Sequence, residues 1–195
     1  IRDLETAEIS IQAALTGHLV VSTIHTNSAA GVIPRFLSMG VKAFLLAPAL
    51  NAVIGQRLVR RLCKDCMVDL ELSASQKVEV TRLLKAIPAS SGVIVDTSTL
   101  HFKGPGKGCV TCNNLGYKGR VGIYEIFTMN KEIEAAILAP NVSEYTILDL
   151  ALKNGMTTMA QDGLLKALDG LTSVDEVLAV ANTDTLITEP EPPAT

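Results

Sequence analysis

The sequence predicts an α/β fold in which helices alternate with short apolar strands. Apolar residues at positions 4, 7, 11, 14 and 15 repeat with the period of an amphipathic helix. Residues 18–24 then form an almost continuously apolar, β-branched run, which is typical of a buried strand. Residues 53–60 alternate in part between apolar and polar side chains, as a strand does. Helices that alternate with such strands indicate a layered α/β unit.

Glycines and prolines set the expected ends of these first elements. The first helix is expected over residues 4–16, because Gly17 is a good helix terminator. A second helix is expected over about residues 29–39, although Pro34 falls inside it, where a proline usually kinks or breaks the helix. The chain is then expected to be helical or irregular up to the strand at residue 53.

The rest of the chain contains a capping box and a series of helix starts. Ser73 and Gln76 have the spacing of a capping box, which predicts a helix to about residue 87. A glycine-framed basic turn over 116–120 is expected before a strand over 121–127, and 183–195 is expected to be a disordered tail. Between them, short helices are predicted from N-caps and glycine stops. The caps are Asn130, Ser143, Thr157 and Thr172, and the stops are Gly155 and Gly170.

Composition excludes some classes of function. The net charge is −3 and aromatic residues make up only 4% of the chain, which argues against general nucleic-acid binding. The most apolar stretch, residues 41–55, is interrupted by Lys42, Pro48 and Asn51 and is shorter than the ~20 residues that a membrane span needs. The chain starts at Ile1 with no signal-peptide pattern, so we expect a piece of a longer, cytoplasmic protein.

The four cysteines are the strongest chemical signal. Cys63 and Cys66 form one C-x-x-C knuckle, and Cys109 and Cys112 form another. Two such knuckles let four thiolates converge on one ion, so we predict a closed, structural zinc site with no open position for catalysis. A redox centre and two disulfides are the alternatives. The first would require a βαβ context and leaves the duplication unexplained, and the second conflicts with a reducing compartment.

A polar segment follows the first predicted strand. His18 lies at the start of that strand, and His25 and Thr26 lie just beyond its end. The carboxyl end of a strand in an open α/β sheet is where ligands bind, and a helix N-terminus nearby suits a phosphate. From spacing alone, ordinary loop and capping residues remain the alternative, since no G-x-x-x-x-G-K-[ST] motif occurs in the chain.

Three strings together resemble one protein family. Ile1-Arg-Asp-Leu-Glu-Thr-Ala-Glu8 resembles the end of a Walker B signature, and Thr16 to Asn27 is similar to a His box. Gln56 to Cys63, with the second knuckle and Gly116 to Glu125, looks like a tetracysteine insertion. These are motifs of the bacterial ATPases of type II secretion and type IV pilus assembly, and their order matches. Retraction motors of the same family resemble the chain less, because they lack the tetracysteine insertion.

The resemblance implies the C-terminal portion of a RecA-like P-loop ATPase domain with a zinc-binding tetracysteine insertion and a C-terminal helical subdomain. It implies a cytoplasmic homo-hexamer, peripheral to the inner membrane through platform proteins, that uses ATP and Mg²⁺. By position, the resemblance implies that His18 and His25 are the two His-box histidines, in the catalytic group, and that they contact or sense the nucleotide phosphates. The resemblance also implies the remaining site residues, with Asp3 and Glu5 in the catalytic group and Arg2, Thr26 and Arg57 binding nucleotide.

The departures from the family pattern limit what this chain does alone. The P-loop Lys, the Walker B Glu and the interface arginines are expected upstream of Ile1, so the fragment is expected to be inactive. The predicted domains are the ATPase core over 1–61, the zinc subdomain over 62–122, the strand and helical subdomain over 123–182, and the tail. Two alternatives remain: a non-catalytic, zinc-stapled adaptor, and a zinc-ribbon nucleic-acid binder, which the acidic balance disfavours.

Overall fold

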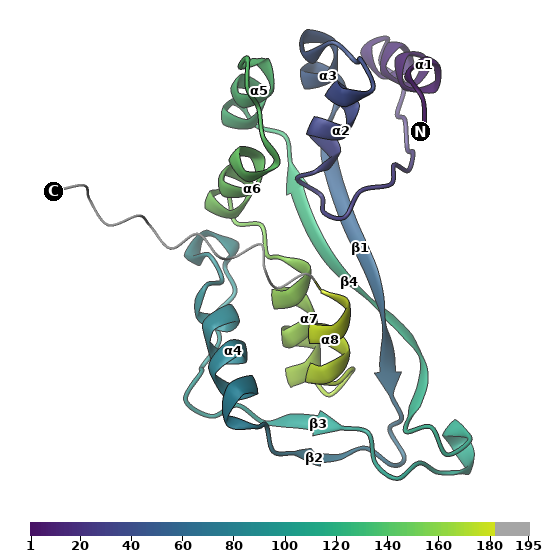
Figure 1. The fold of residues 1–195 in the computed structure, drawn as a ribbon, viewed down its shortest axis with the longest axis vertical. Coiled ribbons are helices and arrows are strands. Elements are labelled where there is room, and N and C mark those ends of the chain that lie inside the picture. The colour runs from purple at the N-terminus through teal and green to yellow at the C-terminus, as the bar shows by residue number, and fades with distance from the viewer. Residues whose placement is uncertain (182–195) are drawn as a thin grey trace, which may run out of the picture. The chain divides into compact units, whose positions relative to one another are not determined.

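A computed structural model describes residues 1–181, which fold into two compact units (Figure 1). The first unit comprises residues 1–55, 88–93 and 125–157, and the second comprises 56–87, 94–124 and the chain from Thr158 onward. The predicted tail lies outside the described residues. Helices and strands both occur, as the predicted α/β class requires. The predicted division into four domains stays a prediction, but the unit boundaries at 55/56 and 124/125 lie close to two of its limits.

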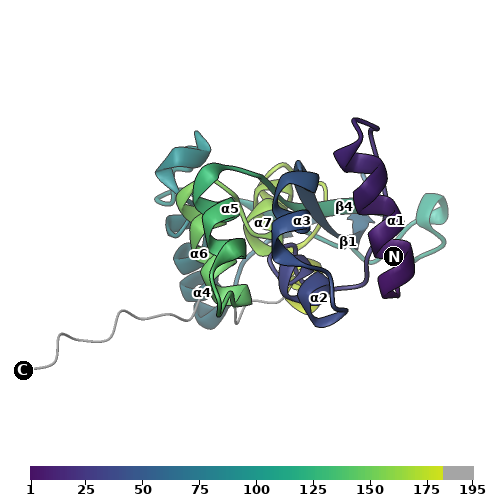
Figure 2. The same ribbon diagram turned by 90° about the horizontal axis from the view of Figure 1, so that it is seen from above.

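The first unit is built mainly from helices. They are α1 (Leu4–Leu15), α2 (Val32–Ser38), α3 (Ala43–Ala49), α5 (Lys131–Leu138) and α6 (Glu144–Lys153). Seen from above, α3 lies between α1 and α5, and it contacts both (Figure 2). Pro34 does not break α2, because it occupies the first turn, where a backbone N–H has no partner within the helix.

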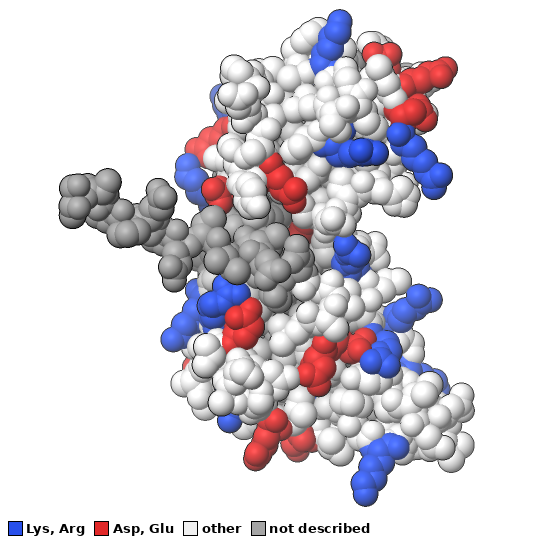
Figure 3. All heavy atoms as spheres, in the orientation of Figure 1, with Lys and Arg blue, Asp and Glu red and all other residues white. Residues whose placement is uncertain are grey.

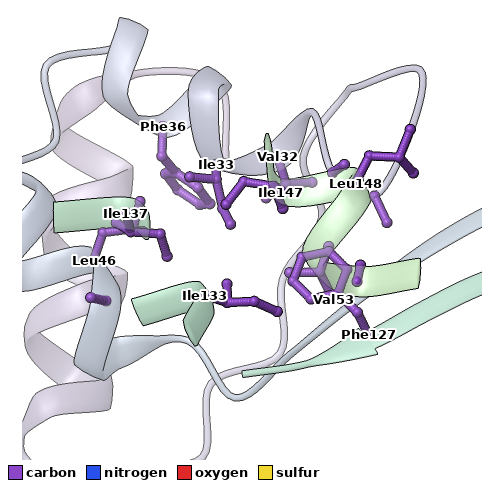
Figure 4. Close-up of a cluster of buried hydrophobic side chains, with 14 of the residues drawn as sticks. Val32, Ile33, Phe36, Leu46, Val53, Phe127, Ile133, Ile137, Ile147 and Leu148 are labelled. Atoms are coloured by element: carbon purple, nitrogen blue, oxygen red, sulfur yellow. The ribbon is translucent and has the colours of Figure 1, made fainter. Parts of the chain in front are cut away.

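Branched aliphatic side chains form the core of the first unit. Ile33 of α2, Ile147 of α6 and Ile133 of α5 have no exposed surface and point into one cluster (Figure 4). Phe36 and Phe127 contribute aromatic rings to it. Burial of one such side chain stabilises the fold by roughly 1.5–3 kcal/mol. This cluster therefore fixes how the helices of the first unit pack on one another.

Two long strands, β1 (Ala52–Leu62) and β4 (Tyr117–Thr128), pair with each other. Met129 N donates to Asn51 O (2.9 Å) at one end of the pair, and Cys63 N donates to Gly116 O (3.0 Å) at the other, so the strands run antiparallel. The predicted strand over 53–60 is confirmed. The predicted turn over 116–120 is wrong beyond its first residue, because β4 starts at Tyr117 and uses these residues for pairing.

The second unit packs three helices with a small sheet. The helices are α4 (Ala74–Lys85), α7 (Met159–Leu168) and α8 (Val174–Val180); β2 (Val68–Leu70) pairs antiparallel with β3 (Phe102–Gly104). Short 3-10 turns lie at Ala89–Ser91, in the first unit, and at Val110–Cys112. The predicted capping box of Ser73 and Gln76 is confirmed at the start of α4. Asn130 and Ser143 also cap as predicted, whereas Thr158 and Ser173 replace the predicted Thr157 and Thr172.

The predicted strand over residues 18–24 is wrong. The segment is irregular, and the side chains of Leu19 and Val21 are each 88% exposed. A strand is stable only when a neighbour satisfies its backbone groups, and no strand pairs with this segment among the described residues. The backbone hydrogen bonds of this segment join His18 N to Ala13 O (3.1 Å) and the Ile1 amino group to Thr23 O (2.5 Å), and neither links it to a strand. The apolar run alone therefore does not form a strand.

Candidate metal centre and candidate functional loop

The two cysteine knuckles meet at the ends of β1 and β4. Cys63 follows the last residue of β1, and the second knuckle ends at Cys112, shortly before β4 begins at Tyr117. Each ligand atom lies within 4.8 Å of the other three. The Sγ atoms of Cys63 and Cys109 are 3.7 Å apart, as are those of Cys66 and Cys112. The structure therefore brings together all four predicted metal ligands.

The sulfur spacing fits a zinc ion and does not fit a disulfide. A regular tetrahedron with Zn–S bonds of about 2.3 Å has edges of about 3.8 Å. The Cys109–Cys112 separation is 3.8 Å, close to that edge length. A disulfide would require about 2.05 Å, and all four cysteines are free. The donor set and spacing are those of a structural tetrathiolate site.

Backbone amides surround one of the sulfurs. Cys112 Sγ accepts hydrogen bonds from Cys109 N and Gly116 N, both at 3.2 Å. Burial disfavours the Cys112 thiolate, but these amides and the neighbouring thiols outweigh it and lower the pKa to about 6. Burial, with thiol hydrogen bonds to the other cysteines, raises the pKa of Cys66 to about 12. Four clustered thiols cannot all ionise without a cation, and a metal ion bound between them would displace their protons.

A hollow of about 400 Å³ lies beside the metal centre. Arg61, Lys64 and Lys118 line it together with Asp65 and Thr111. On the face of the molecule shown in Figure 3, basic and acidic side chains are interspersed. The hollow has a modest excess of positive charge on an open surface, and the buried residues of its lining are Leu62 and Cys63.

The predicted ligand-binding segment lies between α1 and α2. His18 is exposed, and its Nδ1 lies 3.2 Å from both Thr16 Oγ1 and Ala13 O at the end of α1. His25 is exposed and Thr26 is half-buried, with Thr26 Oγ1 donating to Ser28 O (2.8 Å). The structure thus leaves both imidazoles open to solvent on one continuous segment of the first unit.

The other predicted site residues are divided between the two units. Asp3 caps α1 by accepting a hydrogen bond from Thr6 N (2.8 Å), which also lowers the pKa of its carboxyl group. Arg2 and Glu5 are exposed at the same helix start. The Ile1–Thr23 bond places this start beside the segment that carries His25. Arg57 is exposed on β1 and belongs to the second unit, so the structure does not group it with the histidines.

Sequence reasoning missed two carboxylates that hold the loop after His25. Glu125 of β4 accepts a hydrogen bond from Ala29 N (2.5 Å), and Glu144 of α6 accepts one from Ser28 Oγ. These contacts link residues 96 and 116 positions apart in the chain. No local pattern reveals them. We call residues 26–31 the anchored loop.

Comparison with known proteins identifies the family of the chain. The family model described as "Type II/IV secretion system protein" matches residues 1–179. The chain belongs to this family. The chain is similar to the type IV pilus assembly ATPase PilB of Thermus thermophilus, which is 44% identical over 92% of this chain. Type II secretion system protein E of Pectobacterium carotovorum is also 44% identical over 92% of the chain, and PilB of Pseudomonas aeruginosa is 44% identical over 91%.

The chain spans less than half of the length of each of these relatives. It covers 19% of the Thermus protein, 33% of the Pectobacterium protein and 29% of the Pseudomonas protein. None of the helices in the described part of the chain is both long and apolar enough to cross a membrane. These matches confirm the resemblance of the three sequence strings to the ATPases of type II secretion and type IV pilus assembly.

Proposed function

We propose that this chain is the C-terminal portion of a hexameric, ATP-hydrolysing motor that powers type II protein secretion or type IV pilus assembly. The observation that carries the proposal is the 44% identity, over 92% of the chain, to proteins named for each of these two machines. In the full-length protein the first unit would complete a RecA-like core with upstream strands. The exposed, irregular segment over residues 18–24 has no strand partner among the described residues and would pair with those strands.

The nucleotide-facing groups we assign lie on the first unit. His18 and His25 would contact the phosphates through ring N–H groups, and Thr26 would support them through its hydroxyl. Asp3 and Glu5 would order the neighbouring helix start, beside Arg2. When bound with Mg²⁺, ATP supplies the phosphoryl group whose transfer to water drives assembly. Support comes from the exposure of both imidazoles and from the Ile1–Thr23 bond that joins the two strings.

Zinc is assigned a structural role in this motor. Cys63, Cys66, Cys109 and Cys112 would fill all four coordination positions, so no position remains for water or substrate. The ion would close the insertion between the ends of β1 and β4. Arg57 is proposed to bind nucleotide only in the assembled ring, since it belongs to the second unit. The fragment alone is proposed to be inactive, because it has no P-loop lysine motif.

We propose that the full-length protein lies in the cytoplasm and that protein partners hold it at the inner membrane. Platform proteins of the secretion or pilus machine would hold it there, and no contact with nucleic acid is proposed. The modest net charge of −3 is compatible with this location.

ATP turnover of the full-length protein tests the proposed function. His25→Ala is expected to lower turnover at least tenfold without changing the thermal unfolding temperature, because the residue is exposed. His101→Ala is the matched control, since His101 is an exposed histidine of the second unit outside the proposed site. Unchanged turnover in His25→Ala would remove His25 from the mechanism. A full-length protein that neither binds nor hydrolyses ATP would favour the zinc-stapled adaptor.

A further inference from the structure

Glu125 is a buried carboxylate with a specific backbone partner. Its residue is 7% exposed, although β4 carries mainly apolar side chains inward at this end. Acidic residues are almost never fully buried unless they are paired. The Oε1 atom accepts a hydrogen bond from Ala29 N at 2.5 Å, and Ala29 and the following Ala30 are themselves buried. A bond from an amide to an ionised carboxylate is roughly twice as strong as a neutral one.

Glu144 holds the same loop from a second element. Ser28 Oγ donates to Glu144 Oε1 and at the same time accepts from Gly31 N (3.0 Å). Gly31 lies so close that an added Cβ would come within 3.4 Å of the Glu144 carboxyl group. Thr26 Oγ1 donates a hydrogen bond to Ser28 O (2.8 Å). Side chains from β4 and α6 therefore fix the middle of the anchored loop, and Ser28 bonds both of its ends, Thr26 and Gly31.

His25 immediately precedes the anchored loop. The segment before it has no strand partner among the described residues, so its order depends on the anchors at its two ends. Consecutive Cα atoms are about 3.8 Å apart, and fixing Thr26 and Ser28 therefore confines the backbone of His25 to a small region. Catalytic constellations need such confinement, because a displacement of about 1 Å can cost about a hundredfold in rate.

We propose that Glu125 and Glu144 are positioning residues, which hold the anchored loop so that His25 meets the nucleotide phosphates. This inference rests on the proposed function, since it assumes a role for His25. Neither carboxylate contacts substrate in this arrangement. They make the placement of a phosphate-facing imidazole depend on β4 and on the first turn of α6, which lie far along the chain from the His box.

A double-mutant cycle in the full-length motor tests the proposal. Glu125→Ala is expected to lower kcat about tenfold or more with little change in KM for ATP, and Glu144→Ala, which removes the acceptor of the Ser28 hydroxyl, to lower it severalfold. The double variant of Glu125→Ala with His25→Ala is expected to be no slower than the slower single variant, because both changes remove one positioned group. Glu125→Gln, which keeps an acceptor oxygen at the same place, is expected to recover most of the rate.

Two matched measurements separate positioning from a loss of fold. Glu132→Ala removes an exposed carboxylate of the same unit that pairs with Lys153 and does not touch the anchored loop, so its kcat is expected to be unchanged. Hydrogen exchange of the amides of residues 26–31 is expected to rise at least tenfold in Glu125→Ala and to stay unchanged in Glu132→Ala. Exchange at these amides that did not respond to loss of Glu125 would overturn the anchoring.

The possible failures of the cycle are distinguishable. If His25→Ala leaves turnover unchanged, the proposed role of His25 fails, and the positioning role fails with it. If His25→Ala is impaired but the two effects multiply in the double variant, the positioning role alone is overturned and the proposed function stands. If Glu125→Ala does not fold, Glu144→Ala combined with His25→Ala supplies the same comparison, since Glu144 is exposed and its loss leaves no cavity in the core.

Discussion

Removal of the metal should lower the stability of the chain by an amount that the topology sets. The ion would join Cys63 to Cys109, which are 46 positions apart in the sequence. Closing a loop of this length in the unfolded chain removes entropy worth about 4 kcal/mol at 25 °C, by the relation established for covalent cross-links. For a protein of this size, a change of 1 kcal/mol shifts Tm by about 2–4 °C. Chelation is therefore expected to lower Tm by roughly 8–16 °C.

The assay combines metal analysis with thermal unfolding. The purified chain is expected to contain one zinc per polypeptide, and Tm is measured before and after a strong chelator has removed it. Cys109→Ser should reproduce the loss, whereas Thr111→Ala should not, because Thr111 lies in the same knuckle, is exposed and offers no ligand. A chain that loses its zinc completely and keeps its Tm within about 2 °C would refute the reasoning.

Three further predictions concern the second unit. Arg60 is hydrogen-bonded to Glu176 at 2.6 Å and lowers the pKa of that carboxyl group. The pair therefore stabilises the fold above the ordinary pKa of about 4.5, and this contribution is lost as pH falls through the lowered pKa. Urea titrations should show a lower free energy of unfolding at pH 3 than at pH 7, and Glu176→Gln should reduce that difference. Gln161→Leu should lower the free energy of unfolding in urea by about 1–3 kcal/mol, because fully buried Gln161 donates to Leu83 O (3.1 Å) near the end of α4. A decrease smaller than about 0.5 kcal/mol would contradict this role. Ser73→Ala removes the capping box of α4 and should cost about 0.5–2 kcal/mol, with Ser73→Asp as the control that keeps a cap and the stability.

Local chemistry explains what the sequence could predict. Helix starts depend on one side chain and the amide three residues later, so Ser73 and Asn130 were identifiable as caps. Thr158 was missed by one position, because two adjacent threonines offer the same hydroxyl chemistry. The metal centre was predictable because each knuckle brings two thiolates together within four residues, and Cys109 and Cys112 need only meet the other pair.

Contacts between distant parts of the chain explain what could not be predicted. The run over residues 18–24 has the composition of a strand, but pairing depends on a neighbour that composition does not specify. The small sheet of β2 and β3 joins Leu70 to Phe102 across an intervening helix. Glu125 sits in a strand pattern in which a buried acidic residue carries no signal, and only the fold reveals that it faces Ala29.

The place of the metal centre at the end of the β1–β4 pair has a consequence for how the chain finds its native structure. A slip of two residues between the strands preserves which face each side chain occupies, so the apolar pattern alone penalises it weakly. The same slip would shift one knuckle against the other by about 7 Å. Four sulfurs that must lie within 4.8 Å of one another cannot then share an ion. A metal ion bound by the four cysteines would therefore select the correct alignment of the strands, because it could bind only there and would leave misaligned chains free to rearrange.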